Sequence, residues 1–367
     1  MFLNKILNIF KGFDWILFGV VCLLICFSLA AIYSIAISND SPDFSNFRKQ
    51  LLFGAFGVML IFAISFFDYR LWRDLSYLIY GSVALLLAAV LFFGTTVSGT
   101  TGWFSILGFK FQPVEFAKIA LIIFLAWFLS NQGLRIREFK IFLITAVITG
   151  VYFLLVMLQP DFGSAMILFF IWIMMIFFAG ANKKHLFLIA LAVIVAVLIS
   201  WFFLFQNYQR DRIITFLNPQ ADPYDRGYQV RQAMIAVGAG QWFGRGLGFG
   251  SQSQLKFLPA SQTDFIFAVI AEELGLLGVG LILFFWLIIF YRLIKAAKTV
   301  KDSFATIFIL GVTVLFFVQL VINMGMNIGI VPVTGISLPF LSYGGSFLVT
   351  GLALIGIIES MIVKNKS

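Results

Sequence analysis

Residues 15–37 read WILFGVVCLLICFSLAAIYSIAI, a run of 23 residues without one charged side chain. At 1.5 Å per residue, a helix of this length crosses the roughly 30 Å hydrocarbon core of a bilayer. Similar apolar runs follow at about 51–67, 75–93, 113–130, 139–158, 164–181, 186–205, 265–290, 304–326 and 346–362. Irregular backbone is not tolerated against lipid, and no run shows the alternation of a barrel strand. We therefore predict an all-α polytopic membrane protein with ten transmembrane helices.

The composition excludes a soluble globular protein. Of the 367 residues, 62% are hydrophobic and 11% are charged, against roughly half and a quarter in soluble domains. Cys22 and Cys26 are the only cysteines and lie one helical turn apart in the first run, where we interpret them as small apolar side chains. We treat residues 1–367 as a single integral-membrane domain.

Positive charge predicts the orientation. If the N-terminus is cytoplasmic, the predicted cytoplasmic segments hold most of the 25 Lys and Arg residues, whereas the short outer segments hold only Arg48, Lys49 and Lys110. Cytoplasmic loops of membrane proteins are enriched in Lys and Arg, so both termini are predicted to be cytoplasmic. This pattern explains the net charge of +9, and no nucleic-acid partner is predicted.

Residues 206–263 form one large extracytoplasmic loop between the seventh and eighth predicted spans. Its length and its Gly and aromatic content predict a folded segment, with a short amphipathic helix near 228–239, although a plain connecting loop is the alternative. Six cations lie in it: Arg210, Arg212, Arg226, Arg231, Arg245 and Lys256. They suit an anionic lipid-linked substrate, and a solvated basic face near lipid headgroups is the alternative.

Charges inside predicted spans are costly and mark candidate functional positions. Glu115 and Lys118 are three residues apart on a helix that starts after Gln112-Pro113, so they share a face and pair. The pair either fixes helix packing or lines a polar cavity in which Lys118 holds a phosphate. Glu272 and its neighbour Glu273 lie in the eighth span, where either one lines a cavity or pairs inside the bundle.

Two further sites lie at predicted outer turns. Asp161 begins a helix after Gln159-Pro160, where capping is a sufficient explanation. Residues 332–346 are too rich in Pro and Gly for a regular helix but apolar enough for membrane depth, where such backbone is tolerated only if it is buried or lines a cavity. We therefore predict a re-entrant or partly inserted loop at the outer face.

Asp264 is the strongest candidate for acid–base chemistry. It lies where the long loop meets the eighth span, and partial desolvation there raises a carboxylate pKa toward that of a general base. The alternative is helix capping, by Asp264 or by Thr263. The single histidine, His185, is predicted on the cytoplasmic side, so chemistry on the outer face requires carboxylates, metals or tyrosine.

Motifs along nearly the whole chain resemble the SEDS family (shape, elongation, division and sporulation). They are FDYR at 67–70, FQPVEFAK at 111–118, QPDFG at 159–163, RIITFLNP at 212–219, GYQ at 227–229, TDFIFA at 263–268, Glu272-Glu273, NMGMN at 323–327, PVTG at 332–335 and SYGGS at 342–346. They follow the family order from about residue 14 to 362. The short termini and Asp68-Tyr69-Arg70 are more similar to the RodA branch than to the FtsW branch.

The resemblance implies a peptidoglycan glycosyltransferase that polymerises lipid II at the outer face of the bacterial cytoplasmic membrane, in cell elongation and shape. It implies a class B penicillin-binding protein as partner, with other elongation-complex membrane proteins. It also implies a divalent cation, Mg²⁺ or Mn²⁺, and no organic cofactor. The alternatives are a lipid II flippase and a weakly active scaffold for the penicillin-binding protein.

The resemblance also assigns residues. The essential loop aspartate of the family corresponds to Asp264, and its buried Glu and Lys correspond to Glu115 and Lys118. The predicted substrate-binding set is Glu115, Lys118, Asp161, Arg212, Arg231, Lys256, Thr263 and Glu272. The chain departs from the usual Leu-Pro-Glu-x-His-Thr-Asp pattern, because Ala260 replaces the Glu and Gln262 replaces the His.

Overall fold

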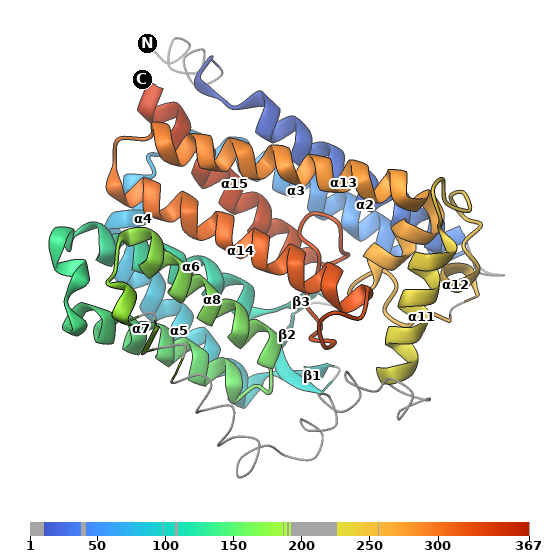
Figure 1. Ribbon diagram of the computed structural model, residues 1–367, viewed down its shortest axis with the longest axis horizontal. Coiled ribbons are helices and arrows are strands. Elements are labelled where there is room, and N and C mark those ends of the chain that lie inside the picture. The colour runs from blue at the N-terminus through green and yellow to red at the C-terminus, as the bar shows by residue number, and fades with distance from the viewer. Residues whose placement is uncertain are drawn as a thin grey trace.

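The computed structural model describes residues 11–37, 42–97, 99–106, 109–185, 187–188, 191, 226–255 and 257–366 (Figure 1). Within these residues, nine helices are long and apolar enough to cross a membrane. They are α2 (Trp15–Ile37), α3 (Ser45–Phe66), α5 (Ser76–Phe93), α6 (Pro113–Ser130), α7 (Phe139–Met157), α8 (Phe162–Ala179), α13 (Ile266–Thr299), α14 (Ser303–Asn327) and α15 (Gly345–Lys366). Nine of the ten predicted spans are thus confirmed, and most of the predicted span 186–205 lies outside the described residues.

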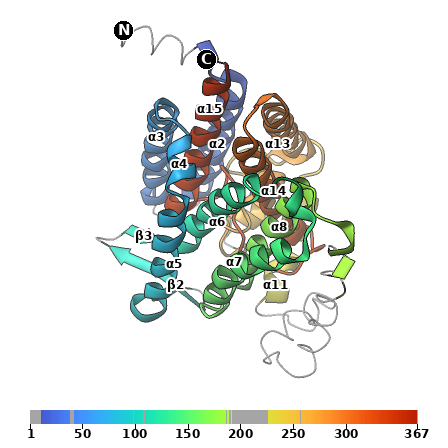
Figure 2. The same ribbon diagram turned by 90° about the vertical axis from the view of Figure 1, so that its left-hand side faces the viewer.

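The long helices form a bundle around α6. Helix α6 packs against α5, α8, α14 and α15, as Figure 2 shows in a view along the bundle. Many side chains on the outside of the bundle are apolar, and Phe92 and Phe93 are 82% and 78% exposed. Such side chains match a hydrocarbon environment, so the chain is a multi-pass membrane protein.

The two ends of the bundle differ. The backbone N–H of Asp14 donates to Glu359 Oε2 (2.9 Å), which places the start of α2 beside the end of α15. The opposite end carries α11 (Arg226–Ala239) and α12 (Ser251–Gln254), both packed against α13 (Figure 1). Helix α11 confirms the helix predicted near 228–239, and residues 226–255 confirm that this part of the long loop is folded. Which end of the bundle lies on the cytoplasmic side of the membrane stays a prediction.

Helix α13 is broken at Gly275. The backbone there has φ 64° and ψ −162°, a conformation that glycine adopts far more readily than other residues. The break divides α13 into helical pieces 266–274 and 276–299, which corrects the expectation of one uninterrupted eighth span.

A small antiparallel sheet joins α5 to α6 and was not predicted. Its strands β1 (Thr95–Val97), β2 (Thr100–Ile106) and β3 (Phe109–Phe111) pair in sequence order. Strand β3 ends one residue before Gln112, the N-cap of α6, so the sheet lies directly against the start of that helix. Short elements α4 (Arg70–Asp74) and η1 (Gly133–Arg137) connect other spans.

The segment between α14 and α15 is irregular, as predicted, and residues 338–342 within it are buried. Leu338, Leu341 and Ser342 are fully buried. Ser342 Oγ accepts from the N–H of Leu338 (2.8 Å), and Ser28 Oγ donates to the carbonyl of Leu341 (2.6 Å). Irregular backbone is stable at membrane depth only where the protein satisfies its polar groups in this way.

Candidate active site

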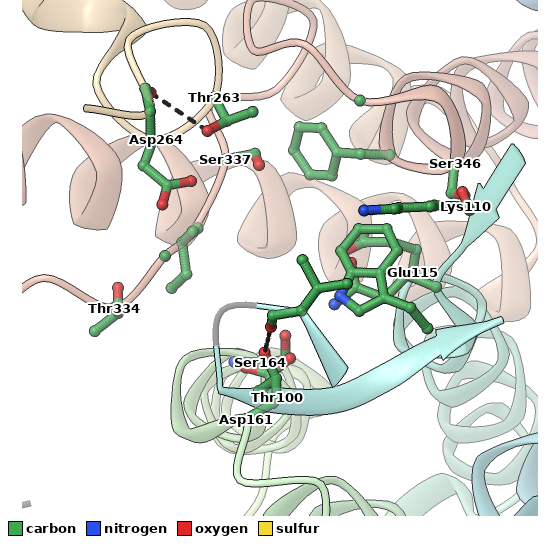
Figure 3. Close-up of a pocket in the computed structure, with 18 of the residues that line it drawn as sticks. Thr100, Lys110, Glu115, Asp161, Ser164, Thr263, Asp264, Thr334, Ser337 and Ser346 are labelled. Carbon is green, nitrogen blue, oxygen red and sulfur yellow. Dashed lines mark hydrogen bonds between the residues drawn. The ribbon is translucent and has the colours of Figure 1, made fainter. Parts of the chain in front are cut away.

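A cavity of about 990 Å³ lies where the sheet, three helix starts and two loops meet (Figure 3). The helix starts are those of α6, α8 and α15, and the loops are 259–264 and 333–337. The charged side chains that line it are Lys110, Glu115, Lys118, Asp161 and Asp264. Because α15 starts at the cavity and ends beside Asp14, the cavity lies toward the end of the bundle opposite the start of α2.

Asp264 lies in the turn immediately before α13, and its carboxylate faces the cavity (Figure 3). Its main-chain oxygen accepts hydrogen bonds from the side-chain amides of Asn323 and Asn327, each at 3.0 Å. These bonds from α14 hold the turn in place. Burial raises the pKa of the Asp264 carboxyl to about 6, because a low-dielectric environment disfavours its charged form. A carboxylate with such a pKa is suited to general-base chemistry near neutral pH.

Neither Asp264 nor Thr263 caps α13. The N-cap residue is Phe265, whose own side chain makes no capping hydrogen bond. The Thr263 hydroxyl donates to the carbonyl of Ala260 (3.3 Å), and the Thr263 carbonyl accepts from Ser342 Oγ (2.6 Å). Thr263 also lines the cavity, and these two hydrogen bonds close the turn that carries Asp264.

Glu115 and Lys118 form the predicted pair in the first turns of α6. Lys118 Nζ lies 2.8 Å from Glu115 Oε1, and both side chains are buried in the cavity wall. The Lys118 ammonium also lies 6.0 Å from the ring centroid of Phe347 at the start of α15. The ammonium is stabilised by the carboxylate and by the nearby π-face, and the pair as a whole is close to neutral.

Asp161 both caps α8 and lines the cavity. Its carboxylate accepts from the backbone N–H of Ser164 (2.9 Å), which confirms the predicted capping. One carboxylate oxygen is therefore committed to the helix start.

The structure separates Glu272 from the cavity. Its buried carboxylate accepts from the backbone N–H groups of Gln252 (2.8 Å) and Ser253 (3.1 Å), and it is not among the lining residues. Gln252 and Ser253 belong to α12, so Glu272 anchors this short helix against the first piece of α13. The expectation that Glu272 belongs to a substrate cavity is wrong for this cavity.

Of the loop cations predicted to bind substrate, Arg231 lies within the described residues. On α11, Gln229 lines the cavity but Arg231 does not, because residues two apart on a helix point in nearly opposite directions. Arg212 and Lys256 lie outside the described residues. Lys110, on β3, lines the cavity, although from the sequence its charge predicts only the orientation of the chain. Its position three residues before Pro113 is the sequence signal that places it near the start of α6.

No metal site is built from protein ligands alone in the described part of the chain. No group of three or more His, Cys, Asp or Glu side chains is arranged to hold a metal ion there. Of the cavity carboxylates, Glu115 is paired with Lys118 and Asp161 caps α8.

The two positions that depart from the family pattern have different surroundings. Ala260 lines the cavity and has φ +50°, in a turn where its carbonyl accepts from the N–H of Thr263 (3.1 Å). The Gln262 side chain does not line the cavity, and its Oε1 accepts from Asn46 Nδ2 (2.8 Å) at the start of α3.

Comparison with known proteins gives consistent matches over the full length. The family described as cell cycle proteins FtsW, RodA and SpoVE matches residues 11–367. Stage V sporulation protein E of Bacillus subtilis is 39% identical over 92% of this chain and 91% of its own length. The peptidoglycan glycosyltransferase MrdB of Escherichia coli is 33% identical over 94% of this chain and 93% of its own. A chain of a solved peptidoglycan synthase complex that coordinates polymerization and crosslinking superposes with a TM-score of 0.82, at 29% identity, covering 96% of this chain and 98% of that one.

Proposed function

Since this chain belongs to the FtsW, RodA and SpoVE family of cell cycle proteins, we propose that it is a peptidoglycan glycosyltransferase that polymerises lipid II into glycan strands. The observation that carries the proposal is Asp264, a carboxylate with a raised pKa in the wall of a 990 Å³ cavity. The cavity lies at one end of the apolar bundle, where a lipid-linked sugar reaches it while its polyprenyl tail stays in the bilayer.

In the proposed reaction, Asp264 takes the proton from the 4-hydroxyl of the acceptor sugar. The hydroxyl oxygen then forms a bond to C1 of the lipid-linked donor sugar, and the bond from C1 to the pyrophosphate oxygen breaks with inversion. The leaving group departs as polyprenyl pyrophosphate with the electron pair of the broken bond. The proton remains on the Asp264 carboxyl until it is released to solvent.

The developing charge on the pyrophosphate requires positive groups. Lys110 and Lys118 are the cations that line the described cavity, and the N-terminal ends of α6, α8 and α15 add partial positive charge. Lys118 is already positioned against Glu115, so it needs no large reorganisation when the anion arrives. Arg212 and Lys256 keep their proposed roles as further contacts from the long loop.

A divalent cation, Mg²⁺ or Mn²⁺, remains part of the proposal. Mg²⁺ sites of phosphate-binding enzymes typically use one or two carboxylates together with phosphate oxygens of the substrate. Asp161 has no lysine partner in the described residues and is not the proposed base, so its second carboxylate oxygen is the protein group that would hold the ion. The ion would neutralise pyrophosphate charge.

A class B penicillin-binding protein is the proposed partner, by analogy with the peptidoglycan synthase complex that coordinates polymerization and crosslinking. The bacterial cytoplasmic membrane is the proposed location, with the cavity on its outer face. Relatives include both a sporulation protein and MrdB, so the RodA-like role in elongation, with other elongation-complex proteins, stays a prediction.

The geometry favours an enzyme over a flippase. Next to the Glu115–Lys118 pair, the cavity adjoins a space of only about 10 Å³, lined largely by apolar side chains such as Leu315 and Leu354. A flippase requires a hydrophilic route through both leaflets, whereas the space beyond this pair is narrow and largely apolar. The scaffold alternative predicts a complex with the partner but no polymer.

Polymerisation of fluorescent lipid II by the purified chain with its penicillin-binding partner tests the proposal. Asp264→Asn should abolish polymer while complex formation stays intact, and Asp43→Asn, at an exposed carboxylate before α3, should leave activity unchanged. Loss of polymer with a chelator, restored by Mg²⁺ or Mn²⁺, would support the cation. Polymer from Asp264→Asn at the parental rate would overturn the base assignment, and an inactive parent in an intact complex would favour the scaffold.

A further inference from the structure

Residues 241–249, here called the aromatic loop, present a cluster of large apolar side chains on the surface. Trp242, Phe243 and Phe249 are 66%, 80% and 76% exposed, and Leu247 is half exposed. Four large apolar side chains are thus exposed within eight residues, and apolar groups gathered on a protein surface mark contact with a partner or a membrane.

The aromatic loop sits on the start of a transmembrane piece that is short for a bilayer. After the break at Gly275, the uncharged run of α13 extends from residue 276 to 291 and ends at Arg292. Sixteen residues rise about 24 Å, whereas the hydrocarbon core is about 30 Å thick. About 6 Å of apolar height is therefore missing. At the other end, Arg292 is held by an ion pair with Asp14 at the start of α2 (2.7 Å), so we assign the deficit to the Gly275 end.

The aromatic loop occupies this end. The backbone N–H of Leu276 donates to the carbonyl of Gln241 (2.8 Å), and that of Leu277 donates to the carbonyl of Trp242 (3.1 Å). Leu276 and Leu277 themselves are more than half exposed. The apolar surface of the loop thus continues the lipid-facing surface of α13 without interruption.

Several backbone groups of the aromatic loop are hydrogen-bonded within the protein. The N–H of Arg245 donates to the carbonyl of Glu272 and that of Gly246 to the carbonyl of Glu273, both at 3.0 Å. The N–H of Gly248 donates to the Glu273 carboxylate (3.3 Å). Irregular backbone can enter an apolar environment only when its polar groups are satisfied internally. The buried carboxylate of Glu273 therefore accepts a hydrogen bond from this loop that water would accept in an ordinary surface loop.

We propose that the aromatic loop is a membrane anchor, which inserts Trp242, Phe243 and Phe249 into the boundary between headgroups and acyl chains of the leaflet at the Gly275 end of α13. The bound partner is lipid. Trp at this depth is typical of membrane interfaces, and the exposed Arg245 in the same loop suits lipid phosphate. The apolar side chains of the loop thus supply the lipid-facing surface that α13 lacks beyond its break.

Site-directed fluorescence in nanodiscs tests this proposal without an activity readout. In a Cys22→Ala, Cys26→Ala background, an environment-sensitive label is attached at Phe243→Cys and, separately, at Phe249→Cys. Phe284→Cys, on the exposed face of α13, is the lipid control, and Pro42→Cys, in the exposed segment before α3, is the water control. Quenching is measured with iodide in water and with a nitroxide attached to the lipid.

We expect labels at 243 and 249 to show iodide quenching constants several-fold lower than the label at 42, with strong quenching by a nitroxide near the headgroup. The label at 284 should be quenched best by a nitroxide deeper in the acyl chain. Iodide quenching at both loop positions equal to that at 42, with no nitroxide effect, would overturn the proposal. Protection that arises only after addition of the penicillin-binding partner would also overturn it, because the patch would then be a protein interface.

Discussion

Asn327 donates a hydrogen bond from its side-chain amide to the main-chain oxygen of Asp264 over 3.0 Å. The amide oxygen of the same side chain accepts from the N–H of Ala268 in the first turn of α13 (3.2 Å). Asn327 is fully buried and thus joins the turn that carries the proposed base to the helix that follows it. This bridge from α14 holds the backbone from which the Asp264 side chain projects.

Replacement of Asn327 by Ala should reduce both stability and polymerisation. It leaves the N–H of Ala268 buried without its acceptor, which costs about 1–3 kcal/mol of unfolding free energy. Asn323 still holds the Asp264 carbonyl, so the protein should fold while its rate falls by about tenfold or more through misplacement of the base. Thermal unfolding and lipid II polymerisation measure the two effects. Asn365→Ala, which removes a bond to the carbonyl of Thr299 (3.0 Å) at the opposite end of the bundle, is the control and should retain the full rate.

The raised pKa of Asp264 predicts how activity depends on pH. A general base must be ionised, and burial places its pKa at about 6 rather than the usual 3.8. The rate under subsaturating lipid II should therefore be maximal above about pH 7 and fall with a midpoint near pH 6. A pH profile of initial rates checks this midpoint. A rate that stays constant from pH 7 to pH 5 would contradict the assignment of Asp264 as base.

The same shift has a defined sign for stability. An acid with a raised pKa binds its proton more tightly in the folded state than in the unfolded state. Between about pH 6 and pH 4, acidification should therefore stabilise the parent relative to Asp264→Asn, which cannot titrate at this position. Melting temperatures of the two proteins across this window measure the difference. A constant difference in melting temperature over the window would mean that the carboxyl is not desolvated.

The buried pair in α6 predicts a non-additive result. Glu115→Gln or Lys118→Met alone leaves one buried charge without a partner, and each should cost about 3–5 kcal/mol of unfolding free energy. The double variant removes both charges and should recover most of the stability. Activity should stay low in the double variant if Lys118 contacts the pyrophosphate. A double variant that is both stable and active would mean that the pair serves helix packing and does not contact the substrate.

Much of the architecture could be predicted because membrane spans are constrained by length and composition alone. Run 113–130 of the sequence matches α6 at both ends, and Asp264 lies at the predicted junction between loop and helix. The break at Gly275 was missed because a single glycine inside an apolar run is common in membrane helices. What stabilises the break is non-local, namely the carbonyls of Gln241 and Trp242.

The dependence on non-local contacts also explains why the sequence predicted the wrong surroundings for Glu272. A buried Glu in a span marks a polar contact, but the identity of that contact depends on which distant segment folds over it. For Glu272 the contact is the backbone of residues 252 and 253, and for Asp161 it is its own helix start as well as the cavity. Only the Asp161 contact is local, and only that one followed from the sequence pattern.

The two departures from the family pattern predict different effects on the pH profile. Ala260 lines the cavity in the same tight turn as Asp264, since the N–H of Phe265 donates to the carbonyl of Ala260 (3.3 Å). Ala260→Glu places a second carboxylate near Asp264, and repulsion between like charges should raise the pKa of Asp264 and move the midpoint of the pH profile above 6. Ala260→Gln has nearly the same size without the charge and should leave the midpoint unchanged.

Gln262→His should behave differently, because the side chain at this position faces Asn46 and not the cavity. We expect it to keep the midpoint of the parent and to alter only the contact with the start of α3. Initial rates across pH for the three variants, each with its penicillin-binding partner, distinguish the positions. A shifted midpoint in Gln262→His, with none in Ala260→Glu, would mean that position 262 and not position 260 faces the reacting groups.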